Sequence, residues 1–148
     1  MYFFWTFGII VKGSDSRNHS IILERSKSYK YNMQKIRKNI QQFAKVRNWD
    51  KFHSPKNLSM ALASEVGELL EIFQWLKEEE TMVDRINQNN LVKVKEELAD
   101  IFIYLIRIAD KLNIDLIAEA EKKIKMNAKK YPVKLSKGNA VKYNRRNE

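Results

Sequence analysis

Two pairs of acidic residues have the clearest capacity for chemistry in this sequence. Glu65 and Glu68 lie three positions apart, and so do Glu97 and Asp100 further along the chain. Residues three apart are neighbours on a helix, with Cβ atoms roughly 5–6 Å apart, so each pair can present carboxylate oxygens in one direction. Two such helices packed together would offer four oxygen ligands to a hard divalent cation, Mg²⁺ or alternatively Mn²⁺.

The alternative is that these acids are solvated charges on amphipathic helices, because 31% of all residues are charged. The apolar residues around the four acids favour a metal site over solvated charges. Both segments are apolar around most of their circumference, which predicts buried helices whose carboxylates need a cation or a basic partner. The flanking apolar residues are Ala61, Leu62, Val66, Leu69, Leu70, Phe73 and Leu76 in the first segment, and Val94, Leu98, Ile101, Phe102, Leu105 and Ile108 in the second.

Four helices and no strand are predicted, which gives an all-α fold of the four-helix bundle type. Apolar residues at spacings of three and four predict the first helix over residues 33–46. Ser54 or Asn57 can cap a second helix that runs to about Lys77, and Pro55 suits its first turn.

The second half of the chain also contains capped helices, without an internal sequence repeat. A capping-box pattern over residues 81–84 predicts that a helix restarts there, with a break at 89–90 before a long helix over 91–112. Asp115 can cap a last helix, which must end near Lys130 because the residue before a proline is steered out of helical geometry.

Length and composition fit one domain, since 148 residues with 44% hydrophobic content can build a core. We expect a flexible N-terminal extension over 1–32, a helical domain over 33–132 and a basic arm over 133–148. The extension is either an upstream translation or a partner-binding peptide. Its apolar stretch at residues 1–11 is too short to span a bilayer, so no membrane association is expected.

The absence of cysteine excludes disulfide scaffolds, zinc–thiolate sites and thiol catalysis, and it fits a cytoplasmic protein. Net charge is +10, and residues 129–148 hold seven Lys or Arg against one Glu. A basic segment beside an acidic metal site suits a polyphosphate substrate, because cations can contact the phosphates while carboxylates hold the metal. Nonspecific binding of nucleic acid would explain the same charge.

Three segments combine the acids with further motifs: RNWDKFHSPKNLSMALASEVGELLEIFQW, KEELADIFIYL and KKIKMNAKKYPVKLSKGNAVKY. Over about residues 33–143 the chain resembles the MazG-like all-α nucleoside triphosphate pyrophosphohydrolases, and among them the dCTP pyrophosphatase branch. The resemblance implies hydrolysis of a deoxynucleoside triphosphate, dCTP or a modified dCTP, to the monophosphate and pyrophosphate. It also implies a role in nucleotide-pool cleansing and assembly as a homo-oligomer, a dimer or a dimer of dimers.

The same resemblance assigns roles to individual residues. It implies that Glu65, Glu68, Glu97 and Asp100 bind Mg²⁺. From its position in the middle of these acids, Glu68 is also a candidate to orient the attacking water. Glu71 lies one turn further on and is a candidate general base, although it would serve equally well as the partner of a lysine.

Substrate contacts are implied for eight residues: Trp49, His53, Trp75, Tyr104, Lys123, Asn127, Lys130 and Tyr131. The aromatic rings would line the nucleoside pocket, but each could instead belong to the core. Similarly, the polar stripe of the last helix would contact the phosphates or form an ordinary solvated face. Ile40 departs from the pattern, because relatives that prefer cytosine nucleotides have a histidine there, which weakens a strict preference for dCTP.

Three other functions are compatible with these residues. One is a pyrophosphohydrolase of the same superfamily that acts on dUTP or broadly on nucleoside triphosphates. A second, less favoured function is that of a non-enzymatic basic module that binds nucleic acid and uses its acids only in salt bridges. The third is a structural helical protein that a cation stabilises.

Overall fold

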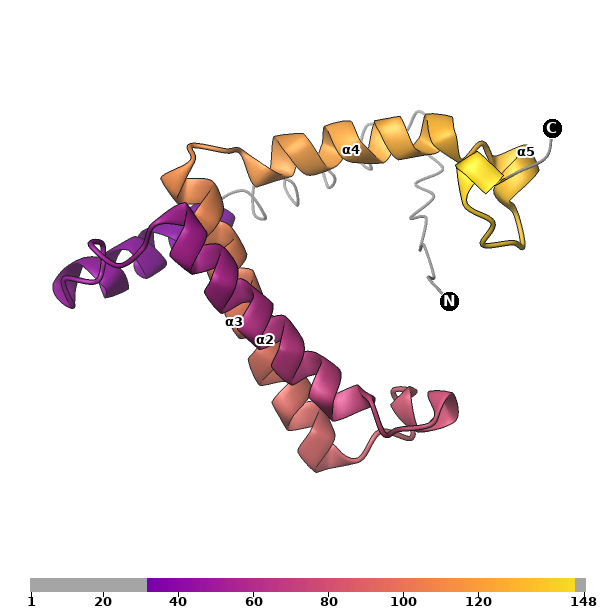
Figure 1. Ribbon diagram of the computed structural model, residues 1–148, viewed down its shortest axis with the longest axis horizontal. Coiled ribbons are helices and arrows are strands. Elements are labelled where there is room, and N and C mark those ends of the chain that lie inside the picture. Colours follow the sequence, from indigo (N-terminus) through magenta and orange to yellow (C-terminus); the bar gives the residue numbers. More distant parts are fainter. Residues whose placement is uncertain (1–31, 146–148) are drawn as a thin grey trace, which may run out of the picture. The chain divides into compact units, whose positions relative to one another are not determined.

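The computed structural model describes residues 32–145, and these residues are helical without any strand (Figure 1). The all-α prediction is confirmed for this part of the chain, whereas the predictions for residues 1–31 lie outside it. The elements are a helix over residues 32–46, α2 (Pro55–Phe73), the 3-10 helix η1 (Glu78–Thr81), α3 (Gln88–Lys111), α4 (Leu116–Lys130), the short α5 (Val133–Ser136) and the 3-10 helix η2 (Tyr143–Arg145).

The chain divides into two compact units between Ile114 and Asp115. One contains the helix over residues 32–46, α2 and α3, and the other contains α4 and α5. The arrangement of all four long helices in one bundle stays a prediction, as do the domain boundaries. No helix within residues 32–145 is long and apolar enough to cross a membrane.

The start of α2 follows the predicted cap. The Ser54 hydroxyl accepts a hydrogen bond from the backbone N–H of Asn57 at 3.1 Å, and Pro55 occupies the first turn. The helix ends at Phe73, however, and not near Lys77 as predicted. The reason is local, because the Glu80 carboxylate accepts a hydrogen bond from the Lys77 N–H at 2.8 Å and holds Lys77 in an extended conformation that starts η1.

The predicted capping box at residues 81–84 is also wrong. Thr81 is the last residue of η1, and its hydroxyl donates to the Glu78 carbonyl at 2.7 Å. The cap of α3 is Asn87, whose side chain accepts the Asn90 N–H at 2.8 Å. Since residues 89–90 therefore form the first turn of α3, the predicted break at these positions does not exist.

Helices α2 and α3 run antiparallel along each other (Figure 1) and make the main packing contact of their unit. Leu58 of α2 and Val94, Ile106 and Ala109 of α3 are buried, and Ala44 is the buried residue of the helix over residues 32–46. Polar contacts from Arg37 and Gln41 to Asp110 hold that first helix against α3.

A hairpin of two helices buries only the facing stripes of each, so the predicted burial around most of the circumference is wrong for the single chain. Several of the flanking apolar residues are exposed, namely Val66, Leu70, Leu98, Phe102 and Leu105. This surface is compatible with the predicted homo-oligomer, which stays a prediction.

The second unit is organised around α4. Asp115 caps this helix as predicted, since its carboxylate accepts the N–H groups of Ile117 and Ala118, each at 3.1 Å. The helix ends at Lys130, as the following proline requires. Beyond it, the rings of Tyr131 and Tyr143 meet edge to face with their centroids 5.9 Å apart, so the basic arm returns to the end of α4.

Candidate active site

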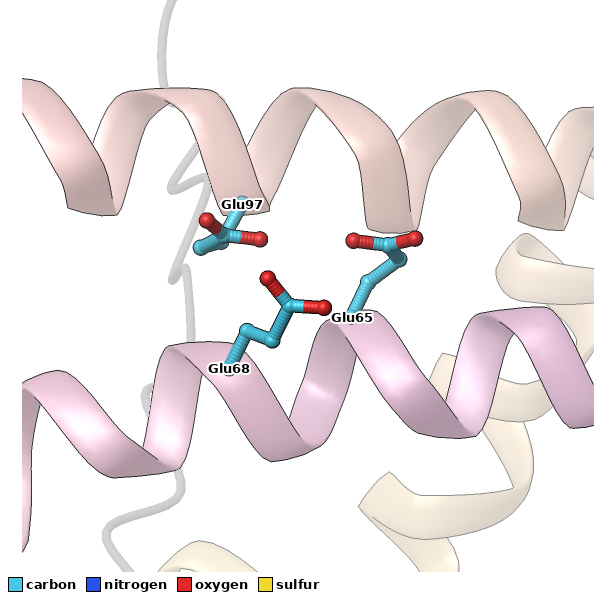
Figure 2. A group of neighbouring side chains, drawn as sticks. All are labelled: Glu65, Glu68 and Glu97. Atoms are coloured by element: carbon cyan, nitrogen blue, oxygen red, sulfur yellow. The ribbon is translucent and has the colours of Figure 1, made fainter.

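Three carboxylates converge where α2 and α3 face each other. Glu65 and Glu68 project from α2, and Glu97 points toward them from α3 (Figure 2). One oxygen from each side chain lies within 4.8 Å of the others. Because the two α2 residues are three positions apart, their side chains leave the helix on the same side, and the packing of the hairpin adds the third. We refer to these three residues as the acid cluster.

Asp100, the fourth predicted ligand, lies one turn beyond Glu97 on α3. Its side chain is exposed and its oxygens are not among those within 4.8 Å. It is nevertheless close enough for its charge to raise the pKa of Glu65. The structure thus brings together three of the four predicted ligands and places the fourth at the margin of the acid cluster.

The pKa of Glu65 is raised above its ordinary value of 4.5. Desolvation is the largest cause, followed by the negative charges of Glu68, Asp100 and Glu97 and by a hydrogen bond with Glu97. Burial and the charge of Glu65 likewise raise the pKa of the Tyr104 hydroxyl, which places this tyrosine beside the cluster. The arrangement concentrates negative charge that a cation would neutralise.

The acid cluster fits a hard divalent cation by its donor set. Carboxylate oxygens are the ligands that Mg²⁺ and Mn²⁺ prefer, and Mg²⁺ sites in proteins often use only a few carboxylates together with substrate phosphates. Oxygens within 4.8 Å of one another can converge on one ion with little side-chain movement. Glu71 is exposed and lies outside this group, so the geometry gives it no place among the ligands.

The loop after the first helix carries two of the predicted substrate residues. Asn48 adopts the left-handed conformation with φ 53°, which Asn tolerates, and this turns the chain so that the Trp49 N–H binds the Ala44 carbonyl at 3.0 Å. The Trp49 ring meets the rings of Phe43 and His53 edge to face, with centroids 5.7 Å and 6.3 Å apart. Trp49 is 43% exposed, so part of the indole remains accessible.

Trp75 follows the end of α2 and is 85% exposed. It is therefore not a core residue of the single chain, which was the alternative to a role in the nucleoside pocket. Tyr104, in contrast, is half-buried beside the acid cluster.

Four predicted substrate residues lie in the second unit: Lys123, Asn127, Lys130 and Tyr131. Lys123 and Lys130 are exposed on α4, and the Lys130 ammonium lies 5.0 Å from the centre of the Tyr143 ring. Their contact with the substrate stays a prediction.

Comparison with known proteins places the chain in a family. The family model described as MazG-like matches residues 60–145, which is more than half of the chain. This protein belongs to the MazG-like family. The matched range includes the acid cluster of α2 and α3 and also α4 with the basic arm, so the family resemblance extends over both units.

Individual relatives agree with the MazG-like assignment. The chain is 41% identical over 111 residues to dCTP pyrophosphatase 1 of Bos taurus, covering 75% of this chain and 66% of that protein. Its identity to dCTP pyrophosphatase 1 of Homo sapiens is 36% over 111 residues, covering 75% and 65%. The chain thus spans just under two thirds of the length of these curated relatives.

Among solved structures, the crystal structure of a pyrophosphatase from Archaeoglobus fulgidus is similar, with a TM-score of 0.63 and 36% sequence identity. The match covers 68% of this chain and 93% of that one. This MazG-like chain therefore shares both sequence and fold with a pyrophosphatase over nearly the whole length of that protein.

Arg107 of α3 contacts a predicted substrate residue, although the sequence motifs did not single it out. This side chain is 4% exposed and contacts His53, one of the predicted substrate residues. A signal was present, because Arg107 interrupts the otherwise apolar run IFIYLIRIA, and a charged residue inside such a run must find partners.

Proposed function

We propose that this protein is a nucleoside triphosphate pyrophosphohydrolase that cleaves a deoxynucleoside triphosphate between its α and β phosphates. The products are the monophosphate and pyrophosphate, which fits a role in nucleotide-pool cleansing. The convergence of Glu65, Glu68 and Glu97 carries the proposal. The relatives named dCTP pyrophosphatase 1 support it, at 36–41% identity.

The acid cluster would hold the divalent cation. In this role we expect Glu65 and Glu97 to be the principal ligands, because both are half-buried and come from opposing helices. Asp100 would add negative charge at the margin of the site and join the ligands once a metal–substrate complex is present. When bound, Mg²⁺ supplies neutralisation of the phosphate charge, which is the largest electrostatic obstacle to attack on phosphorus.

Glu68 is the best-placed residue to orient the attacking water. It belongs to the acid cluster, and it is also exposed, so one carboxylate oxygen can accept a hydrogen bond from a water that approaches from solvent. Glu71 is one turn away and outside the cluster, which makes it the second candidate for the general base.

The base of the nucleotide would stack on exposed aromatic rings. Trp75 and Trp49 offer accessible indole surface, and stacking of a base on such a ring contributes roughly 1–3 kcal/mol. Tyr104 lies beside the acid cluster, where its hydroxyl can hydrogen-bond the sugar or a phosphate. Lys123, Asn127, Lys130 and Tyr131 would contact the triphosphate from α4, either of the same chain or of a neighbouring subunit.

The substrate class is dCTP or a modified dCTP, with dUTP or a broad range of nucleoside triphosphates as the alternative. Ile40 is half-buried on the first helix and cannot hydrogen-bond a base edge. If this position lines the pocket, its side chain would select by shape and not by hydrogen bonding, which relaxes the discrimination between pyrimidines.

The non-enzymatic alternative, a nucleic-acid-binding module whose acids only form salt bridges, has less support. Within residues 32–145, the ion pairs join Arg or Lys side chains to Asp50, Asp110 and Glu119. None of these pairs uses a carboxylate of the acid cluster. The cluster is therefore better explained by a cation than by structural salt bridges.

A panel of nucleoside triphosphates with Mg²⁺, assayed for monophosphate and pyrophosphate, tests the proposal. We expect pyrophosphate release that stops on chelation and in a Glu97→Gln variant, but persists in Glu96→Gln, which removes the neighbouring exposed carboxylate outside the cluster. Turnover of cytosine nucleotides alone would support the narrow substrate class, and broad turnover the alternative. Release of orthophosphate would contradict the assigned cleavage site, and no turnover would refute the enzyme.

A further inference from the structure

Arg107 is the one charged or polar residue that is fully buried within residues 32–145. Its three side-chain nitrogens donate in three directions. Nη1 binds Asp110 at 2.8 Å, Nη2 binds Asp50, and Nε binds Nδ1 of His53 at 3.2 Å. Burying a guanidinium is costly unless its donors are satisfied, so each of these bonds compensates part of its desolvation.

The partners of Arg107 extend the network to three segments of the chain. Asp110 also accepts hydrogen bonds from Arg37 and Gln41 of the first helix, each at 2.7 Å. Asp50 also accepts from Lys111 of α3 at 2.8 Å. The network therefore fixes the loop that carries His53 between the first helix and α3. It is satisfied by contacts in which the acid cluster takes no part.

The hydrogen bond from Arg107 determines which ring nitrogen of His53 carries the proton. A guanidinium in a protein is always protonated and can only donate, so the Nδ1 atom of His53 must be an acceptor without a proton. In the neutral ring the proton is then on Nε2. Protonation of Nδ1 would break the bond to Arg107 and would add a positive charge beside Arg107 and Lys111.

Burial and two of the three neighbouring charges lower the pKa of His53. Desolvation has the largest effect and lowers its pKa from 6.5, and the charges of Arg107 and Lys111 lower it further. Asp50 opposes them. As pH falls below 6.5, the unfolded chain takes up a proton that folded His53 resists, so this group destabilises the fold under acidic conditions.

We propose that Arg107 is a positioning residue for the substrate: it holds His53 as a neutral imidazole whose Nε2–H can donate to a sugar or phosphate oxygen of the nucleotide. The contact between His53 and the nucleotide rests on the proposed function, whereas the state of the ring does not. Trp49 is positioned by the same loop, because its ring packs against that of His53.

Nitrogen-15 NMR of histidine in the full chain measures the ring state directly. The sequence has two histidines, so His19→Gln assigns the remaining signal to His53. We expect the neutral Nε2–H tautomer at pH 7 and a titration midpoint below 6.5. In Arg107→Met the midpoint should rise toward 6.5 and the tautomers should mix. Lys111→Met removes the same charge without touching His53, and it should retain the tautomer.

Kinetics separate positioning from a purely structural role. We expect Arg107→Met to raise KM for the triphosphate about 3- to 10-fold, the effect of one lost hydrogen bond, with kcat changed much less. His53→Ala should raise KM by a similar factor. If Arg107 acts through His53, the double variant should be no worse than His53→Ala alone, whereas independent roles would multiply.

Several results would overturn the inference: a proton on Nδ1 of wild-type His53, an unchanged ring state in Arg107→Met, or multiplicative effects on KM. Should Arg107→Met not fold, Asp50→Asn serves in its place, because Asp50 pairs with Arg107 and about half of its side chain is exposed. This variant should lower the midpoint of His53 further, since it removes the carboxylate that raises it. A wild type that hydrolyses no triphosphate would refute the proposed function, while the NMR measurement would still decide the ring state.

Discussion

Replacing Glu65 by Gln should have opposite effects with and without a divalent cation. In the absence of metal, desolvation and the charges of Glu68, Asp100 and Glu97 all disfavour the ionised Glu65 carboxylate and raise its pKa. Gln has nearly the same shape and no charge, so Glu65→Gln should stabilise the metal-free protein. With Mg²⁺ present the same carboxylate is a ligand, and its loss should weaken binding.

The size of the first effect follows from the separation of the charges. Two unit charges 4.8 Å apart, the limit of separation in the acid cluster, interact by about 0.9 kcal/mol at the dielectric constant of water. Glu65 has two such neighbours, so its removal relieves roughly 2 kcal/mol before salt screening, and about 1 kcal/mol is a reasonable expectation in buffer. For a chain of this size that corresponds to a rise in Tm of about 2–4 °C.

The second effect follows from linkage between binding and folding. A cation at one hundred times its Kd stabilises the native state by about 2.7 kcal/mol. If Glu65→Gln weakens binding tenfold, the same concentration stabilises by about 1.4 kcal/mol. Thermal unfolding in EDTA and across a Mg²⁺ titration measures both quantities, and Glu96→Gln is the matched control because it removes an exposed carboxylate outside the cluster.

Two outcomes would refute this reasoning. If Glu65→Gln lowers Tm in EDTA, the carboxylate makes a favourable contact in the metal-free protein, and repulsion does not dominate. If Mg²⁺ stabilises wild type and variant equally, Glu65 is not a ligand. A control variant that behaves like Glu65→Gln would show that net charge, and not the cluster, is responsible.

Three further predictions concern the same site. The stability advantage of Glu65→Gln in EDTA should vanish below pH 4.5, where the carboxyl is protonated in the folded and the unfolded chain. The advantage should grow as pH rises from 4.5 and be complete above the raised pKa of Glu65, and urea denaturation at several pH values measures this. Glu68→Gln should lower kcat for pyrophosphate release about 10²-fold or more, whereas Glu71→Gln should lower it much less, because only Glu68 lies in the acid cluster. Equal losses of kcat in the two variants would contradict this ranking of Glu68 above Glu71. Trp75→Ala should raise KM about tenfold, because the base loses one of its two proposed stacking surfaces. Steady-state kinetics measure this, and an unchanged KM would remove Trp75 from the pocket.

Features that depend on a few neighbouring residues could be read from the sequence. The caps at Ser54 and Asp115 and the end of α4 before Pro132 each involve atoms within about one helical turn. The same is true of the spacing that puts Glu65 and Glu68 on one side of α2. Competition between local motifs is harder to predict from the sequence. The Glu80 carboxylate accepts a hydrogen bond from the Lys77 N–H at the start of η1, and α2 ends before Lys77.

The tertiary structure alone decided which distant groups meet. Only the register of α2 against α3 could place Glu97 in the acid cluster and leave Asp100 at its margin. Likewise, Arg107 reaches His53 across 54 positions of sequence, a contact that no spacing rule could predict. The sequence by itself determined the all-helical class, the caps at Ser54 and Asp115 and the chemical types available, because these follow from backbone hydrogen bonding and side-chain spacing within a turn. Convergence of charges depends on how two helices pack, and this packing is set by the whole apolar interface between them.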